Sequence, residues 1–318
     1  MTWLDGSDVQ VRDLRVGAKL GQGGQGAVHE LQGLQSGYVY KEYLAANVNG
    51  DALTRLVNVP RTMAAHERDL LLGQSAWPLA RVVDGAKVRG FVMRKVPPGF
   101  WGRRANKPAL RELQYLLYEP KKLWGDIVPL DAPGRLEVAR KAAELFFLLH
   151  SRHLVVGDVS MRNLLWSPPP VSIYLLDCDA IRVVGERPVM PQPQTPDWND
   201  PHQPPTGPEL DTDRYKLALL VARVLSVRAE LRPGEPVPFV DGLPGRVVKE
   251  VAARFAEAAR GPGLRPDAAQ WIKALSDRGT IDLPPLPPVR KPPDLPKAPL
   301  DVRPVQRPVI RLRPPGQG

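Results

Sequence analysis

The sequence predicts an α+β fold, in which strands dominate before about residue 97 and helices dominate after it. Three observations support this division. Apolar and polar residues alternate through residues 26–43, as they do in half-buried strands. Apolar residues recur at helical spacing in residues 135–151 and 211–227. Prolines make up twelve of the last 40 residues, which predicts an extended or disordered tail over residues 279–318.

The composition fits one large domain or two lobes, because 318 residues with 43% hydrophobic content can bury a sizeable core. The net charge of +10 is spread along the chain without interleaved aromatic runs, so we expect no specific nucleic-acid binding. One cysteine, Cys178, excludes an intramolecular disulfide, and the five histidines lack metal-ligand spacing. No signal peptide or run of twenty apolar residues is visible, so we expect a cytoplasmic protein without a membrane span.

A glycine-rich segment lies near the start of the chain, at residues 19–31. Gly21, Gly23 and Gly26 form a G-x-G-x-x-G pattern, and Val28 follows two residues later. Such glycines let backbone N–H groups approach phosphate oxygens. A dinucleotide-binding turn would be followed by a helix, whereas this one is followed by another strand-like segment. We therefore predict a glycine-rich flap between two strands.

Lys41 lies in the alternating segment YVYKEY, residues 38–43. It is either an exposed strand lysine or a cation that reaches phosphates beneath the flap, and the flap favours the second. Residues 44–60 look irregular, and residues 61–74 read as a helix. Glu67 in that helix is the candidate partner of Lys41, with a plain surface glutamate as the alternative.

The middle of the chain begins with a hairpin at residues 79–97 that turns at Asp84-Gly85. Its second strand runs into Pro97-Pro98-Gly99, which we interpret as a hinge. Beyond it we expect helices at residues 111–119 and 135–151.

The stretch from Val155 to Asp179 contains the candidate catalytic and metal-binding residues. Two short apolar runs flank a turn of three prolines, which predicts loop, strand, turn and strand. Asp158, Asn163 and Asp177 would then point toward one place. Phosphoryl transfer needs a residue that orients the incoming hydroxyl and oxygen ligands for Mg²⁺. An Asp-x4-Asn spacing alone recurs by chance, so the rest of the chain decides.

After this stretch, residues 180–209 contain eight prolines and read as a long loop that ends in the segment GPEL. Three further helices are expected at the following residues: 211–227, 247–260 and 265–279. The tail contains a PxxP spacing at Pro284–Pro288, which is either a ligand for an aromatic groove or part of a plain flexible segment.

In this order, the segments resemble the eukaryotic-type (Hanks-like) serine/threonine protein kinases, in a divergent bacterial subgroup. The resemblance covers about residues 14–278 and implies a bilobal fold, with a small β-rich lobe at residues 14–96 and a larger helical lobe at 97–278. It implies that the flap covers ATP. The residues implied to bind the nucleotide are Gly21, Gly23, Gly26, Val28, Lys41, Met93, Arg94 and Val96.

The resemblance also assigns roles to individual residues. Asp158 matches the catalytic aspartate, with Lys41 and its helix partner Glu67 completing the catalytic set. Asn163 and Asp177 match the metal ligands. The resemblance also implies residues that stabilise the fold. Glu209 in GPEL and Arg265 would form a buried ion pair. Asp213 would start the central helix and brace the catalytic loop.

Three departures from the family pattern stand out. Val156-Gly157 replaces the His-Arg before the catalytic aspartate, which leaves a loop phosphate without its usual partner. Ser160 stands where serine/threonine kinases carry a lysine toward the γ-phosphate. Asp177-Cys178-Asp179 replaces D-F-G. The metal-binding aspartate is therefore retained as Asp177, whereas Cys178 replaces the phenylalanine.

The implied function is transfer of phosphate from ATP, with Mg²⁺ or Mn²⁺, to Ser or Thr of protein substrates. The chain itself would be one substrate, at Thr195 and Thr206 in the long loop. Two alternatives remain open: a pseudokinase or ATP-binding scaffold, and a small-molecule phosphotransferase whose loop also reads G-D-x4-N. The resemblance further implies a metal-dependent protein phosphatase and a von Willebrand factor A protein as partners.

Overall fold

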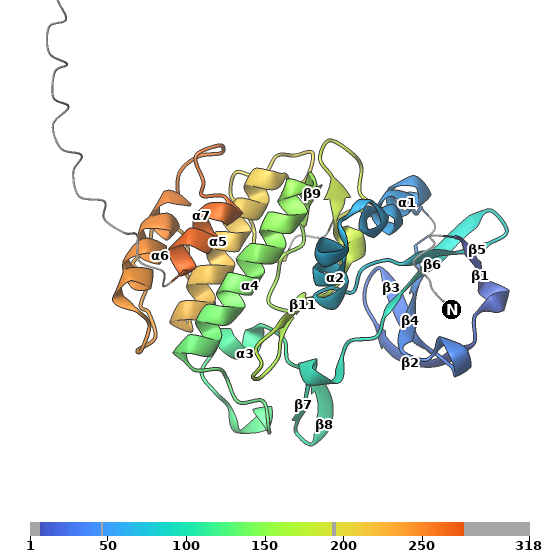
Figure 1. The fold of residues 1–318 in the computed structure, drawn as a ribbon, viewed down its shortest axis with the longest axis horizontal. Helices are drawn as coiled ribbons and strands as arrows, with labels where there is room; N and C mark the ends of the chain where they lie inside the picture. The colour runs from blue at the N-terminus through green and yellow to red at the C-terminus, as the bar shows by residue number, and fades with distance from the viewer. Residues whose placement is uncertain (1–6, 46, 193–194, 277–318) are drawn as a thin grey trace, which may run out of the picture. The chain divides into compact units, whose positions relative to one another are not determined.

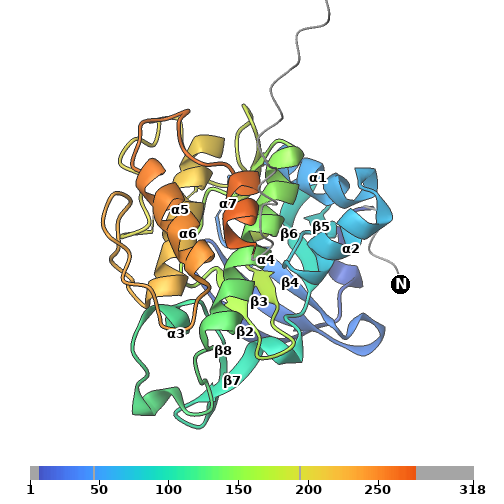
Figure 2. The same cartoon turned by 60° about the vertical axis from the view of Figure 1, so that its left-hand side comes forward.

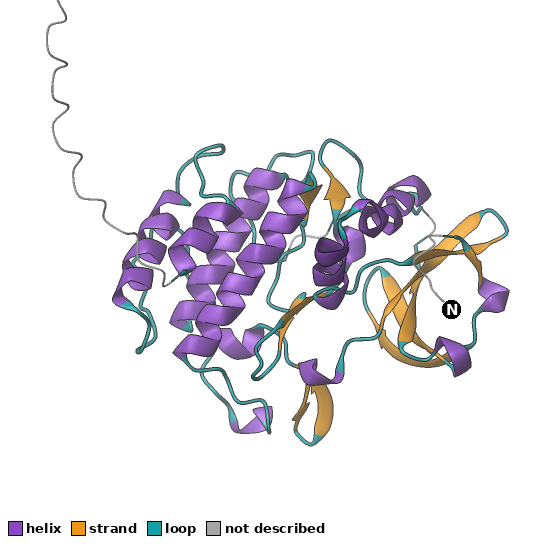
Figure 3. Cartoon of the chain, viewed as in Figure 1, coloured by secondary structure: helices purple, strands orange, loops and turns teal. Residues whose placement is uncertain are grey.

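The computed structural model describes residues 7–45, 47–192 and 195–276 (Figure 1). The chain divides into a compact unit, Met1–Asp277, and a second unit, Arg278–Gly318, which falls outside the described residues. The predicted proline-rich tail and its PxxP segment lie there. The compact unit combines a β-rich sheet region with a set of helices, which confirms the mixed α and β character expected from the sequence (Figure 3).

The main sheet has six strands in the order β1-β5-β6-β4-β3-β2. Only the β1–β5 pair is parallel among these neighbours. The strands are β1 (Val9–Gln10), β2 (Val16–Gln22), β3 (Gly26–Leu31), β4 (Tyr38–Tyr43), β5 (Ala80–Asp84) and β6 (Lys87–Arg94). The predicted strand–turn–strand at the glycines is therefore confirmed as the β2–β3 hairpin, and the hairpin predicted at residues 79–97 as β5–β6.

Two helices accompany this sheet: α1 (Gly50–Asn58) packs on β5, and α2 (Ala65–Gly73) follows a 3-10 turn at Val59–Thr62. The prediction of irregular chain over residues 44–60 was wrong for α1. Asn49 caps that helix by accepting a hydrogen bond from Ala52 N (3.1 Å), and its apolar face is buried. The predicted helix at residues 61–74 is confirmed in its second part.

Four helices form a bundle after residue 130: α4 (Ala132–Ser151), α5 (Leu210–Ser226), α6 (Gly245–Glu257) and α7 (Ala268–Leu275). Helix α4 packs on α5 and α7, and α6 packs on the same two (Figures 1 and 2). Almost all of α5 is buried. The apolar periodicities in the sequence predicted all four helices to within a few residues.

The described residues also form three small strand pairs outside the main sheet. They are β7 (Trp101–Arg104) with β8 (Lys107–Leu110), β9 (Leu154–Val155) with β12 (Arg182–Val183), and β10 (Leu164–Trp166) with β11 (Ile173–Leu175). The β10–β11 pair was predicted. The β7–β8 hairpin was not, although Ala105 and Asn106 both take positive φ in its tight turn. The helix predicted at residues 111–119 shrinks to α3 (Gln114–Leu117).

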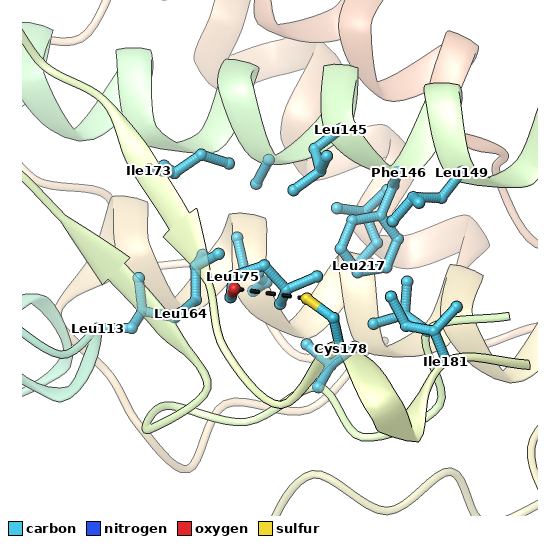
Figure 4. Close-up of a cluster of buried hydrophobic side chains, with 14 of the residues drawn as sticks. Leu113, Leu145, Phe146, Leu149, Leu164, Ile173, Leu175, Cys178, Ile181 and Leu217 are labelled. Atoms are coloured by element: carbon cyan, nitrogen blue, oxygen red, sulfur yellow. Dashed lines mark hydrogen bonds between the residues drawn. The ribbon is translucent and has the colours of Figure 1, made fainter. Parts of the chain in front are cut away.

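A continuous hydrophobic core joins the bundle to the segment that carries the candidate site. Leu145, Phe146 and Leu149 of α4 face Ile173 and Leu175 of β11 across this core (Figure 4). Cys178 is fully buried beside them, and its thiol donates to the Leu175 carbonyl (3.5 Å). Burial raises the pKa of this thiol, so it remains protonated. Cys178 therefore fixes the position of the acidic residues on either side of it.

Candidate active site

Asp158 lies in the loop after β9 and is partly buried. Asn163 donates from Nδ2 to both the carbonyl oxygen and Oδ2 of Asp158, each at 2.9 Å. Thr195 donates from Oγ1 to the other carboxylate oxygen at 3.2 Å. Burial raises the pKa of Asp158, and these hydrogen bonds partly oppose the rise. The carboxylate thus sits among neutral donors, one of which is a threonine hydroxyl.

Asp213, in the first turn of α5, holds the loop that precedes Asp158. Its carboxylate is fully buried and accepts hydrogen bonds from Val156 N (2.6 Å) and Gly157 N (2.9 Å). It also lies 3.2 Å from His150 Nε2. A buried carboxylate on backbone N–H groups fixes the loop strongly, because leaving those groups unpaired is costly. The contact expected of Asp213 is therefore present.

Gly157 explains one departure from the family pattern. Its φ of +74° is a conformation that side chains disfavour. A Cβ there would also lie only 2.0 Å from Gln192 Nε2 and 3.1 Å from the Pro208 side chain. An arginine at this position would therefore require the long loop to move away.

Lys216 of α5 is a buried cation behind the same loop, with 1% of its surface exposed. Its Nζ donates to the Gly157 carbonyl at 2.6 Å. Burial lowers the pKa of Lys216, while the charges of Asp213 and Asp158 oppose that effect. Lys216 was not among the residues predicted from the sequence to belong to the site. The available signal was a lysine inside an otherwise apolar helical run.

Lys41 lies on the central strand β4, opposite Val28 on one side and Phe91 on the other. Its Nζ is 2.6 Å from Asp179 Oδ1 and 3.0 Å from Asp177 Oδ1. The Lys41 and Asp179 side chains are 7% and 2% exposed, whereas Asp177 is 52% exposed. Burial alone would lower the pKa of Lys41, but the two carboxylates outweigh it and raise that pKa. The ammonium therefore stays charged.

The predicted Lys41–Glu67 pair is wrong for this structure. The Glu67 carboxylate instead forms an ion pair with Arg152, at the end of α4, and accepts from Ala64 N at 3.2 Å. It therefore caps its own helix and ties α2 to α4. Asp179, one residue past Cys178, takes the place beside Lys41 that we expected Glu67 to fill.

The glycine turn lies between β2 and β3, with Gly23 N donating to Gly26 O at 2.9 Å. A Cβ on Gly26 would lie 2.6 Å from the Glu42 carbonyl, so packing requires this glycine. A Cβ on Gly21 or Gly23 would have no described neighbour within 4 Å. Those two glycines therefore leave space in which another molecule could approach the backbone.

An apolar patch lies where β6 leaves the sheet. Met93 and Val96 pack with Leu176 against a small core of Ala76, Phe100, Leu165 and Tyr174. The side chain of Arg94 donates to the Leu72 carbonyl (3.4 Å), and its charge acts on Tyr174 in this core. Met93 and Val96 can therefore contact a flat apolar ring, whereas the guanidinium of Arg94 is held by the Leu72 carbonyl.

Asn163 and Asp177 are the expected metal ligands. Leu176 N donates to the Asn163 carbonyl at 2.8 Å, which brings the two residues onto adjacent segments. The amide nitrogen of Asn163 faces Asp158, so its oxygen remains for a cation. One amide and one exposed carboxylate suit Mg²⁺, which binds few protein oxygens alongside phosphates. Within the described residues, no group of three or more His, Cys, Asp or Glu suits a metal.

The predicted ion pair between Arg265 and Glu209 is also wrong. Arg265 forms a doubly hydrogen-bonded pair with Asp200 (2.6 and 2.8 Å), in which both side chains are 1% exposed. It also lies 3.0 Å from Asp211. Glu209 is exposed at the start of α5, and its N–H donates to Thr212 Oγ1 (3.2 Å). The buried guanidinium of Arg265 therefore pairs with the buried carboxylate of Asp200 and not with the exposed Glu209.

Comparison with known proteins gives a weak but relevant similarity. No family model matches the chain. Protein kinase YegI of Escherichia coli K12 is 27% identical over 179 residues, which cover 53% of this chain and 23% of that protein. Protein kinase YegI of E. coli O157:H7 is 28% identical over 178 residues, with 52% and 23% covered. The chain thus matches less than a quarter of the length of these relatives.

This similarity supports a kinase-like relationship, with which the β-rich sheet region and helices are compatible. It does not extend to the particular subgroup. Within the described residues, no helix has both the length and the apolar character needed to cross a bilayer.

Proposed function

We propose that this chain is a protein kinase that transfers the γ-phosphoryl group of ATP to serine or threonine. The proposal rests chiefly on one observation. Lys41, Asp177, Asn163 and Asp158 form a connected set through the Lys41–Asp177 contact (3.0 Å), the Leu176 N–Asn163 O bond and the Asn163–Asp158 bonds (2.9 Å). Phosphoryl transfer requires a cation for phosphates, oxygen ligands for metal and a carboxylate for the hydroxyl.

In this proposal the fold is bilobal, with lobes at residues 14–96 and 97–278 and a tail from 279. ATP would supply the phosphoryl group, and Mg²⁺ or Mn²⁺ would neutralise its charge. Asn163 and Asp177 would hold the metal. The glycine turn and Lys41 would orient the phosphates, and Met93 and Val96 would contact the adenine.

Asp158 would orient the substrate hydroxyl and accept its proton. Thr195 already donates its hydroxyl to Asp158, which supports it as a self-phosphorylation site (3.2 Å). Thr206 lines a hollow of about 550 Å³ that also includes Arg182 and Arg214. It is the second proposed site, although the sequence places it eleven residues farther along the loop.

A pseudokinase is the second candidate, and one observation favours it. Lys41 is neutralised by two carboxylates, and each oxygen of the Asp158 carboxylate accepts a hydrogen bond from within the chain. A site satisfied in this way could bind nucleotide without transferring phosphate. A phosphatase and a von Willebrand factor A protein remain proposed partners, which co-purification would test.

The test is incubation of the purified protein with γ-labelled ATP and Mg²⁺, with wild type beside Asp158→Ala. We expect label on the wild-type chain and on an added protein substrate, and none with the variant. Label that persists in Asp158→Ala would refute the role of that residue. Nucleotide binding by calorimetry without any labelling would favour the pseudokinase.

A further inference from the structure

A basic surface lies beside the candidate site, on the β7–β8 hairpin and the segments that pack near it. We call it the hairpin basic surface. It consists of Arg103, Arg104, Lys107, Lys121, Lys122 and Arg162, all of which are exposed. Figure 2 shows the hairpin below the helices, near α3.

This surface is continuous with the loop that carries Asp158. A groove of about 280 Å³ has Arg104 and Lys121 on its wall together with Met161, which lies three residues past Asp158. Gln114 N donates to the Met161 carbonyl (3.2 Å), and Ala105 N donates to the Leu123 carbonyl (3.0 Å). The first bond joins α3 to the Asp158 loop, and the second joins the hairpin to the Lys121–Lys122 segment. The ring of Tyr115 packs edge-on against that of Trp124, with centroids 4.9 Å apart, which links these parts into one face.

The charges of the six cations are only partly compensated by nearby carboxylates. None of them makes an ion pair with a carboxylate in the part of the chain that the structure describes. Three carboxylates lie nearby in the sequence. Asp126 accepts from Arg103 N (2.6 Å) and contacts Arg111 (3.8 Å). Glu112 accepts a hydrogen bond from Gln114, and burial raises its pKa while the charges of Arg162 and Arg104 oppose that rise. Glu119 is exposed. The face therefore keeps a net positive charge.

We propose that the hairpin basic surface binds an acidic flank of the substrate polypeptide whose hydroxyl reaches Asp158. This inference rests on the proposed kinase function and names its substrate class. Unpaired Arg and Lys next to a catalytic loop attract carboxylates and reject basic chains, which sets specificity through charge. Arg162 and Met161 belong to the Asp158 loop itself, so a bound chain would pass directly from the surface to the site.

A polypeptide fits this face better than a nucleic acid does. Single-stranded nucleic acids are held on basic surfaces by bases that stack on exposed aromatic rings. Of the three aromatic residues along the groove, Tyr115 and Trp124 are only 3% and 8% exposed, and Tyr118 alone is well exposed, at 41%. The groove therefore offers charge with little stacking surface.

The experiment compares two peptides with a single serine, one flanked by glutamates and one by lysines. The variant is Arg104→Glu/Lys121→Glu. The control, Lys249→Glu/Lys273→Glu, makes the same charge change at exposed lysines of α6 and α7.

We expect wild type and control to favour the acidic peptide by about tenfold in kcat/KM. The difference should lie in KM and remain modest, because few exposed charge pairs are involved. The site variant should lose or invert this preference. Equal use of both peptides by wild type, or an unchanged preference in the site variant, would overturn the inference.

A binding measurement separates this inference from the proposed function. Fluorescence anisotropy would use the same two peptides with alanine in place of serine, so that no transfer can occur. Binding of the acidic peptide that is lost in Arg104→Glu/Lys121→Glu supports the surface even if no phosphate is transferred. Stronger binding of a single-stranded oligonucleotide at the same ionic strength would overturn it in favour of a nucleic-acid surface.

Discussion

Lys41 and Asp158, the two ends of the candidate site, are held by different kinds of partner. Lys41 lies between two carboxylates, at 2.6 Å from Asp179 and 3.0 Å from Asp177. Asp158 is held by the neutral donors Asn163 and Thr195. Lys216, the buried cation behind the Asp158 loop, donates to a backbone carbonyl instead of the carboxylate.

The difference indicates where the site is sensitive to pH. The carboxylates keep Lys41 charged and raise its pKa, so this end does not titrate near neutrality. Burial raises the pKa of Asp158, and neutral donors oppose that only in part. A proton acceptor must be deprotonated, so transfer should fall with decreasing pH at values above those usual for aspartate.

The largest effect on stability is expected from Asp179→Asn. This change leaves the buried Lys41 with only the half-exposed Asp177, and breaking a buried pair typically costs about 3–5 kcal/mol of stability. Transfer should fall by at least about tenfold, since a misplaced phosphate contact is costly. Thermal unfolding and single-turnover transfer measure the two effects. The double change Lys41→Met/Asp179→Asn is the control, and it should recover stability without recovering activity.

A smaller effect is expected from Gly157→Ala. The positive φ and the 2.0 Å approach of Gln192 make the added methyl strained, so we expect a loss of about 1–3 kcal/mol in the free energy of unfolding. Gly245→Ala, at the open start of α6, serves as the control. Equal unfolding temperatures for the two variants would show that Asp213 does not hold the loop in this conformation.

The pH dependence of transfer tests how Lys216 affects Asp158. Lys216→Met removes a buried charge that lowers the pKa of Asp158, so the acid limb of the transfer rate should move to higher pH. Lys216→Gln can retain a hydrogen bond to Gly157 and should show the same shift with better stability. The charges of Asp213 and Asp200 also act on the Lys216 ammonium, so its removal can change stability as well. The stability of each variant is therefore measured by its unfolding curve. An acid limb that stays in place in both variants would contradict the electrostatic role.

The smallest effect is expected from Glu67→Gln. This carboxylate pairs with Arg152 and not with Lys41, so single-turnover transfer should change by less than about threefold, as for a partly exposed pair. A loss as large as that of Asp179→Asn would mean that Lys41 exchanges partners during turnover. Glu67, and not Asp179, would then be the partner of Lys41 during transfer.

Local patterns predicted much of this fold. Periodicity gave the bundle helices and the β2–β3, β5–β6 and β10–β11 pairs, because each is set by residues close in the sequence. Helix α1 was missed because its signals are the single cap Asn49 and a short apolar face. The β7–β8 hairpin was missed because an alanine occupies a turn position that usually takes glycine or asparagine.

The partners of charged residues were harder to predict than the residues themselves. The strand pattern singled out Lys41, and the helix that follows it suggested Glu67 as its partner, whereas Arg265 and its partner Glu209 both came from the resemblance. The observed partners, Asp179 and Asp200, are the carboxylates buried with those cations. Which carboxylate shares a buried site with a cation depends on tertiary packing, which no local pattern records.

The central claim is that Asp158 is the acceptor of an active kinase site. Single-turnover transfer from prebound MgATP to the acidic-flanked serine peptide tests it most directly, with wild type beside Asp158→Asn. We predict phosphopeptide from wild type and a rate lower by about 10²–10⁴ in the variant, which should still bind MgATP. Wild-type protein that binds MgATP but labels neither peptide nor itself would contradict the claim.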